Sequence, residues 1–241
     1  MQIQISVTSD FVCPWCYIGE KRLTRAIERL PTGIDVQLQW LPFELNPDMP
    51  PDGMDRRSYR SRKFGSWERS QAMDAQTVLA GRDDGATFDY EAIKRTPNTF
   101  LAHRVSWLAQ REGTQRAFVE AAFQAYFAHG RDIGSEGVLA EIASGIGLDR
   151  DAVAAFLSSD EGVESVRALE RTVLERGVQG VPCFDLGGTA IVGAQPAETI
   201  LQTVIEAVGR LAPRPLPFDL PHSTEPPSPS EFSTRELNSV P

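Results

Sequence analysis

Residues 11–17 read Phe-Val-Cys-Pro-Trp-Cys-Tyr, which places two cysteines, Cys13 and Cys16, three positions apart. The alternating run at residues 3–7 predicts a strand before this motif, and the apolar spacing of residues 18–30 predicts a helix after it. A Cys-X-X-Cys pair at a strand-to-helix turn is typical of thiol redox sites. The first turn of a helix carries unpaired N–H groups and the positive end of the helix dipole, which stabilise a thiolate.

The motif residues have separate predicted roles. Cysteines at helix N-termini have pKa values of about 3.5–7.5 instead of about 8.5, so we expect Cys13 to be the exposed nucleophile. We expect Cys16, one turn further along the helix, to be the more buried resolving thiol. Pro14 suits the first helical position, because proline has no N–H to leave unpaired there. Trp15 is a bulky group in a short exposed turn, so we predict that it contacts the partner.

A zinc site is the alternative use of such a cysteine pair. Zinc takes about four ligands in structural sites, but the chain has only 3 cysteines and 3 histidines, without a second closely spaced pair. The remaining candidate ligands, carboxylates apart, are Cys183, His103, His129 and His222. We therefore predict a redox pair and no bound metal.

Composition limits the classes of partner. The chain has 241 residues and a formal net charge of −9, which argues against nucleic acid or an anionic membrane. It contains no run of about 18 apolar residues that could span a membrane. Its first residues lack the basic region and apolar run of a secretory signal, and 3 cysteines do not make a disulfide framework. We therefore expect a cytoplasmic protein.

The order of the predicted elements indicates an α/β fold. A second strand is predicted at residues 34–41, and a right-handed crossover would make it parallel to the first. Residues 55–175 show helical periodicity and no convincing strand. Strand signals return on both sides of Gly187-Gly188, a two-residue hairpin signal, before a last helix that starts near Pro196. The order β-α-β, then helices, then β-β-α predicts a thioredoxin-like fold with a large all-helical insertion.

The same pattern predicts the domain boundaries. We expect residues 1–44 and 177–212 to form the thioredoxin-like domain and residues 45–176 to form the helical insertion domain. Residues 213–241 are rich in proline, serine and threonine, with few apolar side chains, which predicts a mostly disordered tail. The alternative is a tail docked on the body through Phe218, Leu220 or Phe232.

Four positions near these elements carry alternative interpretations. Pro182 opens a predicted strand although proline cannot donate to a strand ladder, which indicates an unusual backbone. Cys183 is either a small buried side chain, which we favour, or a third redox thiol or metal ligand. His103 either touches the active site from the insertion or is a satisfied core or capping histidine, and we favour the second. Asp10 either modulates the thiol or starts the turn, and we favour the turn.

A series of motifs, in order along the chain, carries a resemblance to a known family. The motifs are CPWCYIG at 13–19, PFELNP at 42–47, Asn98-Thr99 with Ala102-His103-Arg104, GVP at 180–182 and GAQP at 193–196. From about residue 3 to 210 the chain resembles DsbA-family thioredoxin-like oxidoreductases of the FrnE-like subgroup. That subgroup is related to the 2-hydroxychromene-2-carboxylate isomerases and the kappa-class glutathione transferases.

The resemblance implies a thioredoxin fold with a helical insertion. It also implies a thiol-disulfide oxidoreductase that exchanges disulfides through Cys13 and Cys16 next to a cis-proline, Pro182. The backbone N–H and C=O of Val181 would then pair with a bound peptide or thiol. Cys183 departs from the family pattern, in which a threonine, an alanine or another small or apolar residue is expected. The expected substrate-binding residues are Pro14, Trp15, Val181, Pro182 and His103.

The related isomerases and transferases usually carry serine in place of the first cysteine and bind glutathione, so Cys13 favours disulfide chemistry. The alternatives are a glutathione-dependent isomerase or transferase acting on a small aromatic substrate, or a redox-sensitive chaperone-like binding protein. We expect protein or small-molecule thiols and disulfides as partners and no required cofactor. Glutathione is an open alternative as a co-substrate. A homodimer whose interface is formed by the helical insertion is also an open alternative. Pro14 and Trp15 offer few hydrogen-bond donors to a thiolate. We therefore expect the reduction potential of the cysteine pair to lie between those of DsbA, about −120 mV, and thioredoxin, about −270 mV.

Overall fold

The computed structural model describes residues 1–211, which form one compact unit. The predicted tail and its docking residues lie outside the described residues. The strands are β1 (Gln2–Ser9), β2 (Asp35–Pro42), β3 (Met54–Asp55), β4 (Arg95–Thr96), β5 (Cys183–Asp185) and β6 (Ala190–Val192). The helices are α1 (Pro14–Glu28), α2 (Arg56–Phe64), α3 (Trp67–Gly81), the 3-10 turn η1 (Arg82–Asp84), α4 (Phe100–Arg111), α5 (Gln115–Phe123), the π-helical turn η2 (Gln124–Ala128), α6 (Glu136–Gly145), α7 (Arg150–Leu157), α8 (Val163–Glu175) and α9 (Ala197–Leu211). Within residues 1–211, no helix has the length and apolar character needed to cross a membrane.

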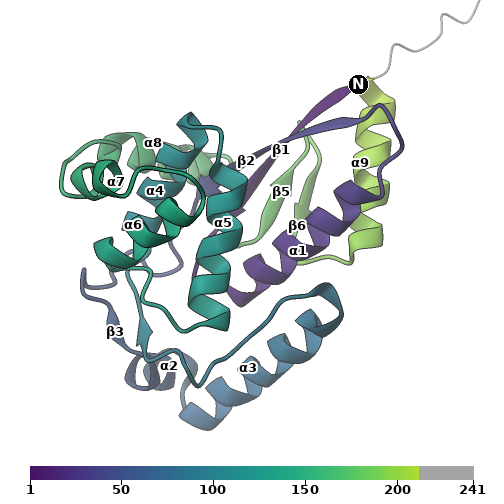
Figure 1. Cartoon of the computed structure of the whole chain (residues 1–241). Coiled ribbons are helices and arrows are strands. Elements are labelled where there is room, and N and C mark those ends of the chain that lie inside the picture. The colour runs from purple at the N-terminus through teal and green to yellow at the C-terminus, as the bar shows by residue number, and fades with distance from the viewer. Residues whose placement is uncertain (212–241) are drawn as a thin grey trace, which may run out of the picture. The chain divides into compact units, whose positions relative to one another are not determined.

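Four strands form a mixed sheet in the order β2-β1-β5-β6. β1 and β2 are parallel, as the predicted βαβ unit requires, and β5 and β6 join the sheet in antiparallel orientation. In β1 the side chains of Ile3, Ile5 and Val7 are buried, whereas Gln4 is exposed. The alternating sequence therefore places its apolar side chains on the buried face of the strand. Figure 1 shows α1 in front of the sheet, with α9 packed beside it. The predicted thioredoxin-like fold is therefore confirmed.

The hairpin between β5 and β6 forms around the two glycines that predicted it. Gly187 and Gly188 have φ values of 74° and 109°, a region that glycine adopts far more readily than other residues. The side chain of Asp185 accepts hydrogen bonds from both of their N–H groups, at 3.0 and 3.2 Å. The N–H of Leu186 donates to the carbonyl of Thr189 at 2.9 Å and closes the turn.

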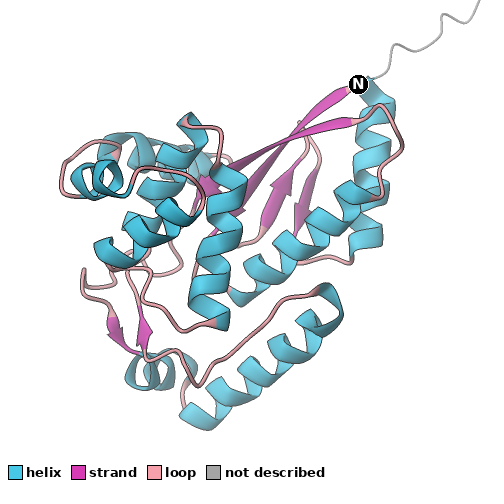
Figure 2. Ribbon diagram, viewed as in Figure 1, coloured by secondary structure: helices cyan, strands magenta, loops and turns pink. Residues whose placement is uncertain are grey.

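The insertion is built from helices, as predicted, with one small exception (Figure 2). β3 and β4 pair in antiparallel orientation, Met54 with Thr96 and Asp55 with Arg95. Two-residue strands carry no periodic signal, so the sequence did not predict this ladder. Helix α1 also begins earlier than residue 18, because the turn of the cysteine motif is itself helical from Pro14 onward.

An aromatic cluster joins the cysteine motif to the insertion. Tyr17 of α1 stacks on Phe123 and Phe127, with ring centroids 5.5 and 5.7 Å apart. Phe11, at the other end of the motif, contacts Phe123 at 5.5 Å and the edge of Phe118 at 5.9 Å. Such pairs contribute about 0.5–1.5 kcal/mol each beyond their buried area. The insertion therefore fixes the position of the turn that carries both cysteines.

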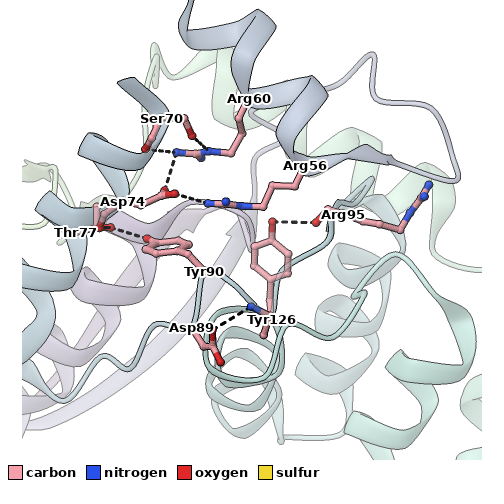
Figure 3. Close-up of polar contacts among 10 residues, drawn as sticks. Arg56, Arg60, Ser70, Asp74, Thr77, Asp89, Tyr90, Arg95 and Tyr126 are labelled. Carbon is pink, nitrogen blue, oxygen red and sulfur yellow. Dashed lines mark hydrogen bonds and ion pairs between the residues drawn. The ribbon is translucent and has the colours of Figure 1, made fainter. Parts of the chain in front are cut away.

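A buried ion-pair network holds α2 against α3 (Figure 3). The carboxylate of Asp74 in α3 accepts hydrogen bonds from Arg56 at 2.6 Å and from Arg60 at 2.8 Å. Arg60 also donates to the hydroxyl of Ser70 at 2.6 Å. The guanidinium of Arg56 lies 5.0 Å from the ring centroid of Tyr90, which adds a cation–π contact. One carboxylate thus forms ion pairs with two arginines in the interior of the insertion.

Asp74→Ala should lower the free energy of unfolding by about 3–5 kcal/mol, because it leaves buried Arg56 and largely buried Arg60 without their shared carboxylate. Glu161→Ala is the matched control, since Glu161 pairs with Arg111 at 2.7 Å on the exposed surface. We expect the control to change stability by at most about 1 kcal/mol. Urea denaturation followed by circular dichroism measures both variants, and equal losses would contradict the importance of the buried network.

Candidate active site

The two cysteines of the motif lie on the first turn of α1. Cys13 is the N-cap residue and Pro14 is the first helical residue, as predicted. The N–H of Cys13 donates to the carbonyl of Asp10 at 3.1 Å, which closes the turn after β1. The carbonyl of Cys13 accepts from the N–H groups of Cys16 at 3.0 Å and Tyr17 at 3.3 Å. Negative charge at this position is favoured by the helix dipole.

The exposure predicted for Cys13 is wrong. Its exposed fraction is only 5%, against 2% for Cys16, so both thiols are buried. Cys13 is covered by a segment that is distant in the sequence. Its thiol donates a hydrogen bond to the carbonyl of Val181, with Sγ and the oxygen 3.8 Å apart. Trp15, between the two cysteines, is 40% exposed, in agreement with the prediction of a surface position.

Cys16 is held in its protonated form by its surroundings. Burial raises the pKa of its thiol well above the ordinary value, and the neighbouring Cys13 raises it further. The carboxylate of Asp10 also raises this pKa, whereas a hydrogen bond from the backbone of Asp10 lowers it. The raised pKa fits the predicted part of Cys16 as the resolving thiol and leaves Cys13 as the thiol of the pair that can act first.

The peptide bond between Val181 and Pro182 is cis, as predicted. Helix α1 approaches this segment at Gly19, where a Cβ atom would lie 3.0 Å from Pro182 Cγ and 3.1 Å from the ring of Phe184. A glycine inside a helix costs about 1 kcal/mol relative to alanine, and the close approach is the reason for it here. Gly19 was not predicted as a contact site, although a glycine inside a predicted helix was a signal for one.

Cys183 follows the cis-proline and is buried. It lies opposite Thr8 of β1 and Val192 of β6 in the sheet. Burial raises the pKa of its thiol, and the carboxylate of Asp185 adds to this effect. These surroundings suit the small buried side chain that the sequence analysis favoured.

Asp10 and His103 meet beneath the active-site turn. Asp10 has an exposed fraction of 0% and His103 of 4%. His103 Nε2 lies 3.6 Å from Asp10 Oδ1, and the other oxygen, Oδ2, accepts a hydrogen bond from the N–H of Leu45 at 2.7 Å. The His103 ring packs 5.0 Å from the ring of Phe11. Asp10 does form the predicted turn, but the burial of its carboxylate was not predicted.

A groove of about 300 Å³ lies between the segment that follows β2 and helix α8. Arg167 of α8 forms ion pairs with Glu44 and, at 2.7 Å, with Glu170. Burial raises the pKa of Glu44, while its hydrogen bond to Arg167 opposes this shift. The bond from Leu45 to Asp10 ties this segment to the active-site turn. The apolar lining of the groove is Pro42, Phe43, Pro47 and Leu174.

The structure thus brings together most of the predicted site residues. Cys13, Cys16, Val181 and Pro182 meet at the start of α1, with Pro14 and Trp15 on the same turn. His103 lies under this turn and not among the exposed side chains. Across residues 1–211, no group of three or more histidine, cysteine, aspartate or glutamate side chains is arranged to hold a metal ion.

Comparison with known proteins gives consistent results. Residues 4–204 match the family described as DSBA-like thioredoxin domain. The crystal structure of the probable DsbA oxidoreductase SCO1869 from Streptomyces coelicolor is 32% identical, with a TM-score of 0.80, over 89% of this chain and 93% of that chain. The uncharacterized protein YwbO of Bacillus subtilis (strain 168) is 29% identical over 195 residues, which are 80% of this chain and 92% of YwbO.

A 2-hydroxychromene-2-carboxylate isomerase shares the fold, with a TM-score of 0.65 at 19% identity over 87% of this chain and 96% of that chain. The FrnE-like subgroup stays a prediction of the sequence. The family match covers most of the chain, and the observed fold has the helical insertion that the motifs implied. The chain therefore belongs to the DsbA-like thioredoxin family of oxidoreductases.

Proposed function

We propose that this protein is a thiol-disulfide oxidoreductase that exchanges disulfides through Cys13 and Cys16. The observation that carries the proposal is the position of both thiols on the first turn of α1, opposite the cis peptide between Val181 and Pro182. The partners are thiols and disulfides of proteins or small molecules, with glutathione as the small-molecule candidate. The cysteine pair itself carries the electrons, so the reaction needs no further cofactor.

Oxidation of a substrate proceeds in two exchange steps. A substrate thiolate attacks Cys13 Sγ of the Cys13–Cys16 disulfide, and the electron pair of the broken bond goes to Cys16, which takes up a proton. A second substrate thiolate then attacks the substrate sulfur of the mixed disulfide. This step releases the oxidised substrate and the Cys13 thiolate, so two electrons have moved to the protein. Run backward, the same steps reduce a substrate disulfide.

The surroundings of the two thiols support Cys13 as the sulfur that is attacked and Cys16 as the one that leaves. The raised pKa of Cys16 keeps it protonated after it leaves, so Cys13 is the sulfur that meets the partner. The thiol of Cys13 donates a hydrogen bond to the carbonyl of Val181. When a partner docks, its own backbone N–H or thiol replaces Cys13 as the donor to this carbonyl. Pro14 and exposed Trp15 then contact the partner beside the bond that forms.

The groove between the segment after β2 and α8 extends the surface available to a partner. Phe43 and Leu174 provide apolar area there, and Leu174 is exposed. His103 is too deeply buried to touch a docked partner. We therefore assign it a role behind the redox pair instead of the substrate contact expected from the resemblance.

Replacement of each cysteine separates the proposed roles. Cys13→Ser should abolish disulfide turnover, because the attacked sulfur is gone. Cys16→Ser should lose turnover and accumulate a mixed disulfide on Cys13, because no resolving thiol remains. Insulin reduction with glutathione as the electron donor measures turnover, and intact-protein mass spectrometry detects the mixed disulfide.

Cys183→Ala is the matched control for these variants, since Cys183 is a buried cysteine one residue from the cis-proline. It should keep turnover within about threefold of the unmodified protein, as expected for a side chain that only packs. Turnover that survives Cys13→Ser would contradict the oxidoreductase proposal. Isomerisation of a small aromatic substrate that survives Cys13→Ser and depends on glutathione would favour the isomerase alternative.

The raised pKa of Cys16 predicts a pH dependence. Only the thiolate reacts with iodoacetamide, and burial, the largest cause of the shift, persists when Cys13 is replaced. In a Cys13→Ser, Cys183→Ala variant, alkylation of Cys16 should therefore stay slow through neutral pH and accelerate only above about pH 9. Mass spectrometry of quenched samples gives the rate at each pH. Half-maximal alkylation near pH 7 would show that Cys16 is not kept protonated.

A further inference from the structure

A cleft of about 500 Å³ opens on the insertion, where the start of α2 lies beside α3 and the segment at residues 90–94. Its lining residues all lie between positions 55 and 94, so none belongs to α1, to the cysteine turn or to β5. Figure 3 shows three of them, Arg56, Asp74 and Tyr90, meeting in one polar cluster. The proposed disulfide exchange does not use this cleft, and its chemistry therefore needs its own explanation.

Arg56 lines the cleft and has more hydrogen-bond donors than the protein uses. Its exposed fraction is only 4%. A guanidinium has five N–H donors, and the acceptor for them within residues 1–211 is one oxygen of Asp74, at 2.6 Å. The guanidinium lies 5.6 Å from the ring centroid of Trp67 and 5.0 Å from that of Tyr90, and these rings supply no strong acceptor. Because buried polar groups are normally hydrogen-bonded, a ligand with acceptor oxygens fits this position.

The charges around the cleft favour an anion. Arg56 and Arg60 share the single carboxylate of Asp74, so this cluster keeps one positive charge in excess. Burial lowers the pKa of Arg60 and the charge of Arg56 lowers it further, while Asp74 opposes both effects. Arg56 and Arg57 are also the first two residues of α2, where the helix dipole favours negative charge over positive. An anion bound there would relieve both conflicts.

Two exposed cations, Arg57 and Lys94, line the same cleft. Lys94 Nζ donates to the backbone carbonyl of Glu91 at 2.6 Å, so its charge is not used on a carboxylate there. Two free-standing acidic residues also line the cleft. The carboxylate of Asp55 is bound to the N–H of Ser58 at 2.8 Å as the cap of α2, and Glu91 is exposed, so water and salt screen its charge. The accessible groups that can approach a ligand are therefore mainly cationic.

We propose that this cleft binds a small molecule through an oxyanion, a phosphate or a carboxylate group, held by Arg56 and closed in by Arg57 and Lys94. The planar fork of a guanidinium matches two oxygens of either group. The N-terminus of α2 adds a favourable dipole. Trp67 and Ile93 give apolar lining for the rest of the molecule. The site goes beyond the proposed oxidoreductase function and requires neither cysteine of the motif.

Isothermal titration calorimetry of the full chain with inorganic phosphate, phenyl phosphate and benzoate tests the proposal. At an ionic strength of about 0.15 M, phenyl phosphate or benzoate should bind with a Kd below about 1 mM. Inorganic phosphate should bind more weakly than phenyl phosphate, because it leaves the apolar lining without a contact. Tighter binding of phenyl phosphate than of benzoate assigns the site to phosphates, and the reverse order assigns it to carboxylates.

Substitutions at the cleft locate the binding. Arg57→Gln and Lys94→Gln should each weaken binding of the tighter probe by about tenfold, because each removes a charge-assisted contact. Both side chains are exposed, so the fold should tolerate these changes. Arg56→Gln should abolish binding, and the two exposed variants still decide the matter if it does not fold. Arg69→Gln is the matched control, since Arg69 is an exposed arginine of α3 outside the lining, and it should change the Kd by less than about twofold.

Two results would overturn the proposal. One is the absence of saturable binding of all three probes up to about 10 mM, which is weaker than a built site for an oxyanion allows. The other is an equal loss of affinity in Arg57→Gln and Arg69→Gln, which would indicate a general effect of net charge instead of a site. Cys13→Ser, which should abolish disulfide turnover, should bind the probes as the unmodified protein does. Failure of this site and failure of the oxidoreductase function are therefore separate outcomes.

Discussion

The contact between the first turn of α1 and the backbone around the cis-proline is the interaction on which the site depends. Cys13 bonds the carbonyl of Val181 across 168 positions of sequence, and Gly19 lets Pro182 approach the same helix. The strand order makes this contact possible, because β5 pairs directly with β1, and α1 follows β1. The two ends of the thioredoxin-like part therefore meet where β1 ends and β5 begins, the two central strands of the sheet, and there a thiol and a backbone acceptor face each other.

The insertion supplies what lies behind that contact. Its aromatic side chains pack on Phe11 and Tyr17, which flank the cysteine pair. Its helix α4 brings His103 to Asp10, and the segment that follows β2 holds Asp10 through the N–H of Leu45. As a result Cys16 is enclosed by protein, and burial raises the pKa of its thiol.

Local patterns predicted the elements, and long-range contacts decided the site's chemistry. The alternation of β1, the glycine pair of the hairpin and Pro14 at the helix start each act within a few residues, so the sequence predicts them directly. The burial of Cys13 and the Asp10–His103 pair depend on segments far apart in sequence, so no local pattern indicates them. The β3–β4 ladder was missed because two residues show no period. The resemblance correctly indicated the cis-proline, which composition alone does not.

We propose that Cys13 and Cys16 form one reversible redox unit. Equilibration of the protein in glutathione buffers of graded ratio, followed by acid quenching and mass spectrometry, tests it most directly. We predict a single two-electron transition, in which the ratio of reduced to oxidised protein changes tenfold per about 30 mV. It should yield one intramolecular disulfide between these residues, with a midpoint between about −120 and −270 mV. A protein that forms only glutathione adducts, or that keeps both thiols free across the whole range, would contradict the account.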